Sequence, residues 1–311
     1  MTIVCATHFT VSSSDAVSVA AHLARRTGQP LWLVTVLPGL GMTAPGPGEK
    51  AVSDVLNQQA ADLRAEGLQV EVASLHGRVE RALGKLCSDI NARLLVVGEG
   101  RHKTTLLGTP VDRIAYGVSV PLLVVRNQNP FEAWARGERP LKVLLAIDHT
   151  WNSAVARDWL SGLAVYGPLD VVAAHVWTPA AELERRPGAK VFSPADDNTL
   201  TERLMGEAEA ALRMLPPNIK SRVHLEQGQG NVGEQLLELA AREHVDMLVL
   251  GTHPKHGVLS RLTSTSTSHE VLSSGMMSVA LVPGEGPSAD SRSRSAATAS
   301  RTLKERAHRT T

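Results

Sequence analysis

The chain contains an internal repeat, in which one unit occurs twice at an offset of about 140 residues, and this limits the folds that it can adopt. Each copy opens with an apolar run, a helical pattern and a second apolar run. In chain order these are Ile3–Ala6, Asp15–Arg26 and Leu31–Leu37 in the first copy, and Val143–Ile147, Asn152–Ala164 and Val171–Val176 in the second. A period of this length equals a whole domain, and a chain of 311 residues has room for two.

The remainder of both copies also follows one order. An insertion that contains Pro and Gly is followed by a helix, a third strand, a helix, a fourth strand, a short helix and a last strand. These are Pro38–Gly48, Val52–Glu66, Leu68–Ala73, Val79–Asn91, Leu94–Val97, Val111–Tyr116 and Val120–Arg126, and then Pro179–Pro194, Leu200–Leu215, Ser221–Leu225, Val232–His244, Met247–Leu250, His269–Leu272 and Ser278–Pro283. Short apolar strands that alternate with helices indicate parallel strands covered on both faces. We therefore expect an α/β fold with two doubly wound, parallel five-stranded sheet domains in tandem.

The composition of the segments between these patterns predicts the domain boundaries. The expected parts are a first domain over 1–127, a linker over 128–140, a second domain over 141–285 and a disordered Ser/Arg-rich tail over 286–311. Proline and glycine favour a linker in the second of these parts, although Phe131 and Trp134 suggest that it packs on a surface.

Charge and hydropathy exclude several classes of protein. Lys and Arg number 32 against 31 Asp and Glu, so nucleic acid is not an expected partner. The chain contains neither a signal peptide pattern nor a run near the roughly 20 apolar residues of a membrane span, which predicts a cytoplasmic protein without a membrane partner. Cys5 and Cys87 fall in a strand and an amphipathic helix, where they are expected to be free.

Ligands of open parallel sheets bind beyond the carboxyl ends of the strands, so the residues there are the candidates for a site. In the second copy these ends are Ala146-Ile147-Asp148, His175-Val176 and the segment Gly251–Gly257.

Two sequence motifs make the chain resemble the universal stress protein family over nearly all of residues 1–285. That family begins with a strand ending in Val-Asp or Ile-Asp and a Ser-rich helix start, which AIDHTWNSAVA at Ala146–Ala156 resembles. It ends with a glycine-rich fourth loop, a helix and a strand of the form Cys/Val-Pro-Val-Leu-Val-Val, which VPLLVV at Val120–Val125 matches. The resemblance implies a role in stress response and regulation.

In nucleotide-binding members, the resemblance implies that the early Asp contacts adenosine while a loop of form Gly-x2-Gly-x9-Gly-Ser/Thr surrounds the ribose and phosphates. This makes ATP, or another adenine nucleotide, the expected ligand, and it places the stronger candidate site in the second copy. Its residues would be Ala146, Ile147, Asp148, Val176, Gly251, His253, Gly257, Ser264, Thr265 and Ser266. The weaker candidates in the first copy are Gly98, Gly100, Gly108 and Thr109.

Both copies depart from the family pattern. His8 takes the place of the Asp in the first copy and its glycine loop is three residues shorter, whereas Pro254 replaces the middle glycine in the second. Asp148 also fits a helix cap, and Gly98 and Gly251 also fit simple strand ends. The resemblance raises the second copy above the first, because only the second keeps the Asp.

Catalytic and metal motifs are not evident. The histidines at 253 and 256 have no carboxylate or cysteine cluster beside them, so no metal is expected. The sequence has no GxSxG elbow and no P-loop, so no enzymatic activity is expected. The leading hypothesis is a regulatory stress protein that binds nucleotide in its second domain. A non-nucleotide interaction module is the alternative, and a nucleotide hydrolase or transferase is the weakest hypothesis.

The family resemblance also predicts how the two domains associate. Single-domain members commonly dimerise along their last strands, which implies that Pro121–Val125 and Val279–Val282 pair within one chain as a pseudo-dimer. An exposed apolar edge strand favours such pairing, and covalent linkage raises the effective concentration of the partner strand. A further homodimer is left open.

Overall fold

A computed structural model describes residues 2–37, 47–99, 109–185, 194–228, 230–252, 267–273 and 277–284. The expected tail over 286–311 lies outside these residues.

The strands and helices follow the expected order in both halves. The first half comprises β1 (Thr2–Ala6), α1 (Val11–Thr27), β2 (Leu31–Leu37), α2 (Pro47–Ala65), β3 (Val70–His76), α3 (Val79–Asp89), β4 (Ala92–Gly98), α4 (Pro110–Gly117) and β5 (Leu122–Val125). After α5 (Asn129–Ala135), the second half comprises β6 (Leu141–Ala146), α6 (Trp151–Leu163), β7 (Leu169–Trp177), α7 (Pro179–Arg185), α8 (Pro194–Leu212), β8 (Lys220–Gln227), α9 (Val232–Arg242), β9 (Met247–Thr252), α10 (Thr267–Ser273) and β10 (Ser278–Pro283).

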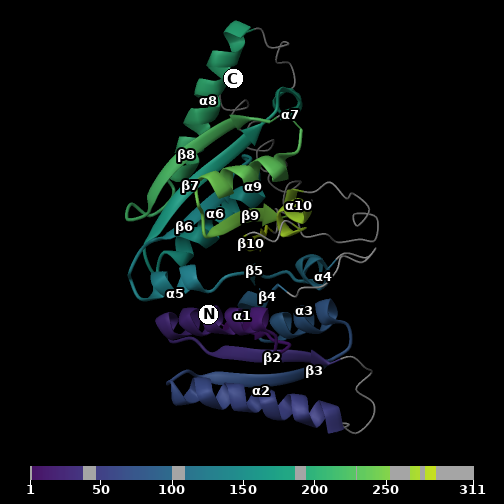
Figure 1. Cartoon of the computed structure of the whole chain (residues 1–311). Helices are drawn as coiled ribbons and strands as arrows, with labels where there is room; N and C mark the ends of the chain where they lie inside the picture. Colours follow the sequence, from purple (N-terminus) through teal and green to yellow (C-terminus); the bar gives the residue numbers. More distant parts are fainter. Residues whose placement is uncertain are drawn as a thin grey trace, which may run out of the picture.

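The strands of both halves form one continuous ten-stranded sheet with the order β3-β2-β1-β4-β5-β10-β9-β6-β7-β8 (Figure 1). Within each half all strand pairs are parallel. The halves meet where β5 pairs with β10 in the antiparallel sense, with Leu122 opposite Leu281 and Val124 opposite Val279. The expected doubly wound α/β fold is confirmed, and the two five-stranded parts are joined edge to edge.

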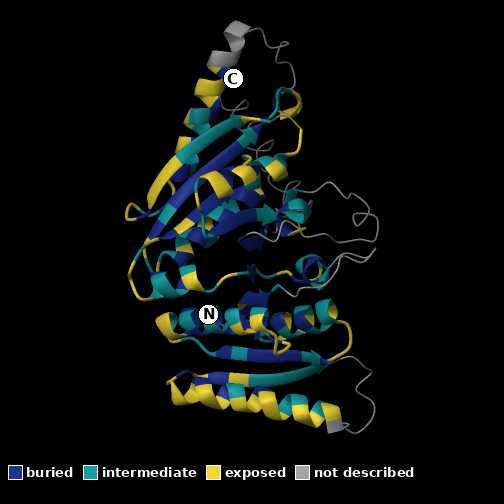
Figure 2. Cartoon of the chain, viewed as in Figure 1, coloured by how far each residue is buried: buried dark blue, intermediate teal, exposed yellow. Residues whose placement is uncertain are grey.

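Helices cover both faces of this sheet because its strands are apolar on both faces. Residues of α1, α2, α5, α6 and α8 pack on one face, and residues of α3, α4, α9 and α10 pack on the other. Each core contains residues of both halves, so each continues across the junction of β5 and β10. Burial follows this arrangement: the inner strands are dark, whereas the outer strands β3 and β8 and the outward helix faces contain exposed residues (Figure 2).

Two segments expected to be irregular contain helices. The expected linker 128–140 includes α5, in which Phe131 and Trp134 are buried and the Trp134 indole donates to the Pro168 carbonyl at 2.9 Å. The expected insertion Pro179–Pro194 begins with α7, where the Thr178 hydroxyl accepts a hydrogen bond from the Ala181 amide at 3.2 Å. Proline is compatible with the first turn of a helix, so its presence in these segments does not by itself exclude a helix.

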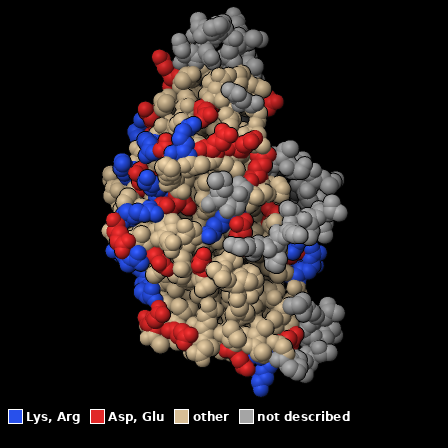
Figure 3. All heavy atoms as spheres, viewed as in Figure 1, with Lys and Arg blue, Asp and Glu red and all other residues tan. Residues whose placement is uncertain are grey.

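The surface has no dominant charge on the face that Figure 3 shows, where basic and acidic side chains are intermixed among uncharged residues. This agrees with the formal net charge of +1. Of the helices in the described ranges, none combines the length and apolar character needed to cross a membrane.

Candidate functional site

The loop after the first strand has the same conformation in both halves. Phe9 and His149 occupy equivalent positions, and both have left-handed backbone angles, with φ of 61° and 60°. The next residues, Thr10 and Thr150, are the N-caps of α1 and α6. An L-residue with positive φ adopts a strained conformation, so this shared geometry indicates a tightly specified turn in each copy.

Asp148 is exposed in this turn and supports the cap instead of being the cap. Its Oδ1 accepts hydrogen bonds from the amide and the hydroxyl of Thr150, at 3.0 and 2.6 Å. Its Oδ2 accepts no hydrogen bond from the described residues. In the first half His8 makes the corresponding contact, with its Nε2 at 3.0 Å from the Thr10 hydroxyl. The first half therefore keeps the turn without the carboxylate.

Gly98 and Gly251 have a packing role at the ends of β4 and β9. A Cβ atom on Gly251 would lie 2.2 Å from the carbonyl oxygen of Asn152, and one on Gly98 would lie 2.0 Å from that of Ser12. These glycines let the first turns of α6 and α1 approach the neighbouring strand ends. The match between the two positions therefore has a structural explanation.

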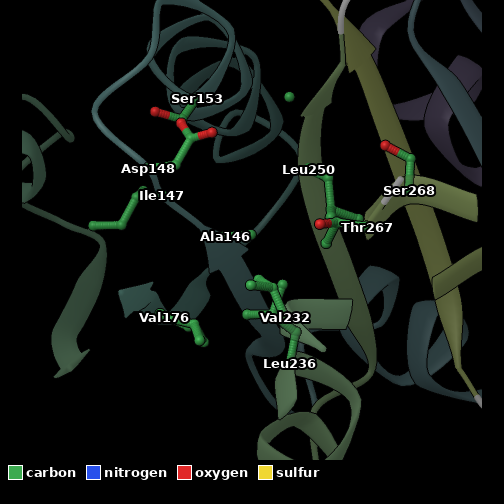
Figure 4. A pocket seen from close by; sticks show the side chains of 12 residues that line it. Ala146, Ile147, Asp148, Ser153, Val176, Val232, Leu236, Leu250, Thr267 and Ser268 are labelled. Atoms are coloured by element: carbon green, nitrogen blue, oxygen red, sulfur yellow. The ribbon is translucent and has the colours of Figure 1, made fainter. Parts of the chain in front are cut away.

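A small cleft opens at the carboxyl ends of β6 and β9, beside α9 and α10. Its volume is about 100 Å³, and it is lined by Ala146, Ile147, Asp148, Ser153, Ala174, Val176, Val232, Leu236, Leu250, Gly251, Thr267 and Ser268. Asp148 and Ser153 lie on one side and Thr267 and Ser268 on the other (Figure 4). β6 has β7 and β9 as its two neighbours, and such a point in an open sheet leaves a crevice beyond the strand ends.

The structure brings five of the expected site residues together in this cleft: Ala146, Ile147, Asp148, Val176 and Gly251. Gly98 and Thr109 lie in the first half, where Thr109 caps α4. The other expected site residues, namely Gly100, Gly108, His253, Gly257, Ser264, Thr265 and Ser266, lie outside the described residues.

Several residues of the cleft lining were not among the site residues expected from the sequence. Ser153 belongs to the Ser-rich start of the helix after Asp148. Residues 263–268 are all Ser or Thr in the sequence, and Thr267 and Ser268 are the last two of them, so both sequence patterns contained a usable signal. Val232 and Leu236 form one face of α9 at a spacing of four residues. That spacing is typical of any core-facing helix, so only the tertiary structure identifies these two as cleft residues.

His175 follows the expected strand end but lies outside the cleft lining. Its side chain is buried, and its Nδ1 lies 2.8 Å from the carbonyl oxygen of Ile147. The ring packs edge-on against His149, with the ring centroids 4.5 Å apart. Burial, together with His175 and Arg185, lowers the pKa of His149 from its usual value. The loop that carries Asp148 is therefore stabilised by the packed imidazole rings of His149 and His175.

Neither cysteine is exposed, and no candidate metal centre is found among the described residues. In those parts of the chain no group of three or more His, Cys, Asp or Glu side chains could hold an ion. Cys5 and Cys87 are free and buried, as expected. Burial raises the pKa of the Cys87 thiol to about 11, which keeps it protonated and unreactive near neutral pH.

Comparison with known proteins identifies the family. The universal stress protein family model matches residues 1–126 and 141–283. A universal stress protein of Mycolicibacterium smegmatis (strain ATCC 700084 / mc(2)155) is 26% identical over 226 residues, which cover 71% of this chain and 69% of the relative.

Solved structures show the same fold at lower sequence identity. A universal stress protein from Archaeoglobus fulgidus DSM 4304 superposes with a TM-score of 0.61 at 17% identity, covering 91% of this chain and 98% of that one. A protein of unknown function from Pseudomonas aeruginosa PAO1 gives 0.60 at 17% identity, covering 91% and 92%. Since the family model spans both halves of the joined sheet, this chain belongs to the universal stress protein family and contains two of its domains in tandem.

Proposed function

We propose that the chain is a stress-response regulatory protein that binds an adenine nucleotide in the cleft of its second half. The observation that carries this proposal is the carboxylate of Asp148 in the lining of a cleft beyond the strand ends, where its Oδ2 accepts no hydrogen bond from the residues that the structure describes. The first half keeps the same turn but has His8 there, so it serves mainly as the structural partner. The pairing of β5 with β10 supports the view that the chain acts as its own pseudo-dimer.

The lining of the cleft suits the parts of a nucleoside. Val176, Val232 and Leu236 offer an apolar surface for a base, and Asp148 Oδ2 can accept a hydrogen bond from a ribose hydroxyl. Hydroxyls of Thr267 and Ser268 lie on the other side as donors. The described cavity, at about 100 Å³, is smaller than the roughly 300–1,000 Å³ of typical ligand pockets, so the phosphates would extend beyond it.

Isothermal titration with ATP, ADP and AMP tests this proposal. Wild-type protein should bind at least one of them, and Asp148→Ala should weaken binding about tenfold or more, because a lost charged hydrogen bond costs about 1.5–3 kcal/mol. Asp148→Asn separates charge from packing, since its amide oxygen can still accept from Thr150. The matched control His8→Ala, in the equivalent turn of the first half, should leave the affinity unchanged.

The alternative hypotheses give different results in the same assay. A lack of both heat and thermal stabilisation at millimolar nucleotide would favour the non-nucleotide interaction module. Release of phosphate or product by the purified chain would instead favour a nucleotide hydrolase or transferase. A larger effect of His8→Ala than of Asp148→Ala would place the working site in the first half.

A further inference from the structure

One carboxylate of the first half reaches both halves of the molecule. Asp112 on α4 is 3% exposed, and its Oδ2 accepts hydrogen bonds from the amide and hydroxyl of Thr109 at 2.7 and 2.8 Å. This contact closes the capping box of α4. The other oxygen, Oδ1, lies 3.4 Å from Nδ1 of His269 on α10 of the second half.

Only one of the two oxygen atoms of the Asp112 carboxylate takes part in capping α4. Oδ1 is buried and has no hydrogen-bond partner among the residues that the structure describes. A buried acceptor without a hydrogen bond is costly, and a nearby imidazole that can carry a proton offsets this cost. The geometry thus favours a persistent contact between Asp112 and His269.

A second side chain of the first half holds the other end of α10. The guanidinium of Arg126, which follows β5, donates to the carbonyl oxygens of Leu272, in α10, and Met277. Glu99 fixes this guanidinium in place through two hydrogen bonds of 2.7 and 2.9 Å. The Arg126 side chain is only 4% exposed, so its orientation depends on these partners.

We propose that the first half completes the cleft of the second half, with Asp112 and Arg126 as positioning residues that hold α10 in place. α10 supplies Thr267 and Ser268 to the cleft, directly before His269 in the sequence. In Figure 1, α4 and α10 face each other across the junction of the halves. The consequence for ligand affinity rests on the proposed nucleotide function, whereas the positioning of α10 does not.

Hydrogen–deuterium exchange on the ligand-free full-length chain tests the positioning directly. Asp112→Asn keeps an oxygen that can accept from Thr109 but removes the charge that faces His269. It should speed exchange of α10 amides at least about fivefold, the lower end of typical coupling between sites. The amides of α8, which packs on the opposite face of the sheet, should not change and serve as the internal reference.

Two further variants separate the contact from a general loss of stability. His269→Gln removes the same contact from the second half and should speed α10 exchange to a similar extent, while the double variant should add little. Asp54→Asn, an exposed position on α2 of the first half, is the matched control and should leave α10 unchanged. If Asp112→Asn speeds exchange throughout the chain, this variant has lost global stability, and the exchange of α10 in His269→Gln then tests the proposal.

The outcomes are distinct. Unchanged α10 exchange in His269→Gln, or fully additive effects in the double variant, would overturn the proposal. An ATP titration of the same variants should show a parallel loss of affinity of about fivefold if the cleft binds nucleotide. If wild-type protein binds no ATP, the proposed function fails, but the exchange result still decides whether Asp112 positions α10.

Discussion

The conformation of the turn that contains Asp148 depends on residues that do not line the cleft. His149 is not part of the cleft lining and packs against His175, with Glu182 and Arg185 of α7 and Glu207 of α8 near it. Its Nε2 is buried, has no hydrogen-bond partner in the described part of the chain and lies 3.6 Å from a carboxylate oxygen of Glu207. Burial, His175 and Arg185 disfavour the imidazolium more than the two carboxylates favour it, so the pKa of His149 is lowered.

This lowered pKa predicts that acid weakens the folded state. In the unfolded chain His149 should titrate near its ordinary value of about 6.5. Below that pH the unfolded chain binds a proton that the folded chain resists, so the free energy of unfolding should fall until the pH passes the folded pKa. Urea unfolding between pH 5 and 7.5 measures this slope, and His149→Gln should flatten it. The same slope in both proteins would contradict the assignment.

Among the secondary-structure elements, α6 packs closely against the end of β9 because Gly251 has no side chain. Gly251→Ala would place a methyl group against the Asn152 carbonyl, and backbone atoms there cannot move aside without shifting the helix. We expect a loss of about 1–3 kcal/mol in the free energy of unfolding, measured with urea. Gly206→Ala on α8 is the matched control: a Cβ there meets nothing within 4 Å, so helix propensity should stabilise it by up to about 1 kcal/mol. Equal stability of the two variants would show that α6 adapts freely.

The elements also show what the sequence could predict. The strands were located because runs such as Leu31–Leu37 are apolar apart from Thr35, a pattern typical of strands covered on both faces. α5 and α7 were missed because Pro and Gly nearby indicated loops, whereas burial of Phe131 and capping by Thr178 depend on tertiary and local contacts. Asp148 was found from its position after a strand. The cleft residues of α9 and α10 were not found in this way, since only the folded sheet brings them opposite Asp148.

At the scale of the whole molecule, the two halves share their hydrophobic cores. Leu123 and Val125 of β5 share one core with Ala280 and Val282 of β10, and Leu122 and Val124 share the other with Val279 and Leu281. Unfolding one half alone would expose both cores at the junction and leave β5 or β10 as an unpaired apolar edge. We therefore expect a single cooperative transition in urea, despite two domains of one family.

Two spectroscopic probes can measure this cooperativity because they report on different parts of the chain. Trp32 is the one tryptophan of the first half, whereas Trp134, Trp151, Trp159 and Trp177 lie after it, so fluorescence follows mainly the second half. Circular dichroism in the far ultraviolet follows the helices of both halves. The two unfolding curves should coincide in the wild type.

Ala280→Asp places a charge at a fully buried position of the junction and should lower the unfolding midpoint strongly. Ser221→Asp, at an exposed position on the edge strand β8, should change the midpoint little. Separate fluorescence and dichroism midpoints in the wild type would show that the halves unfold independently and that the joined sheet adds little to stability.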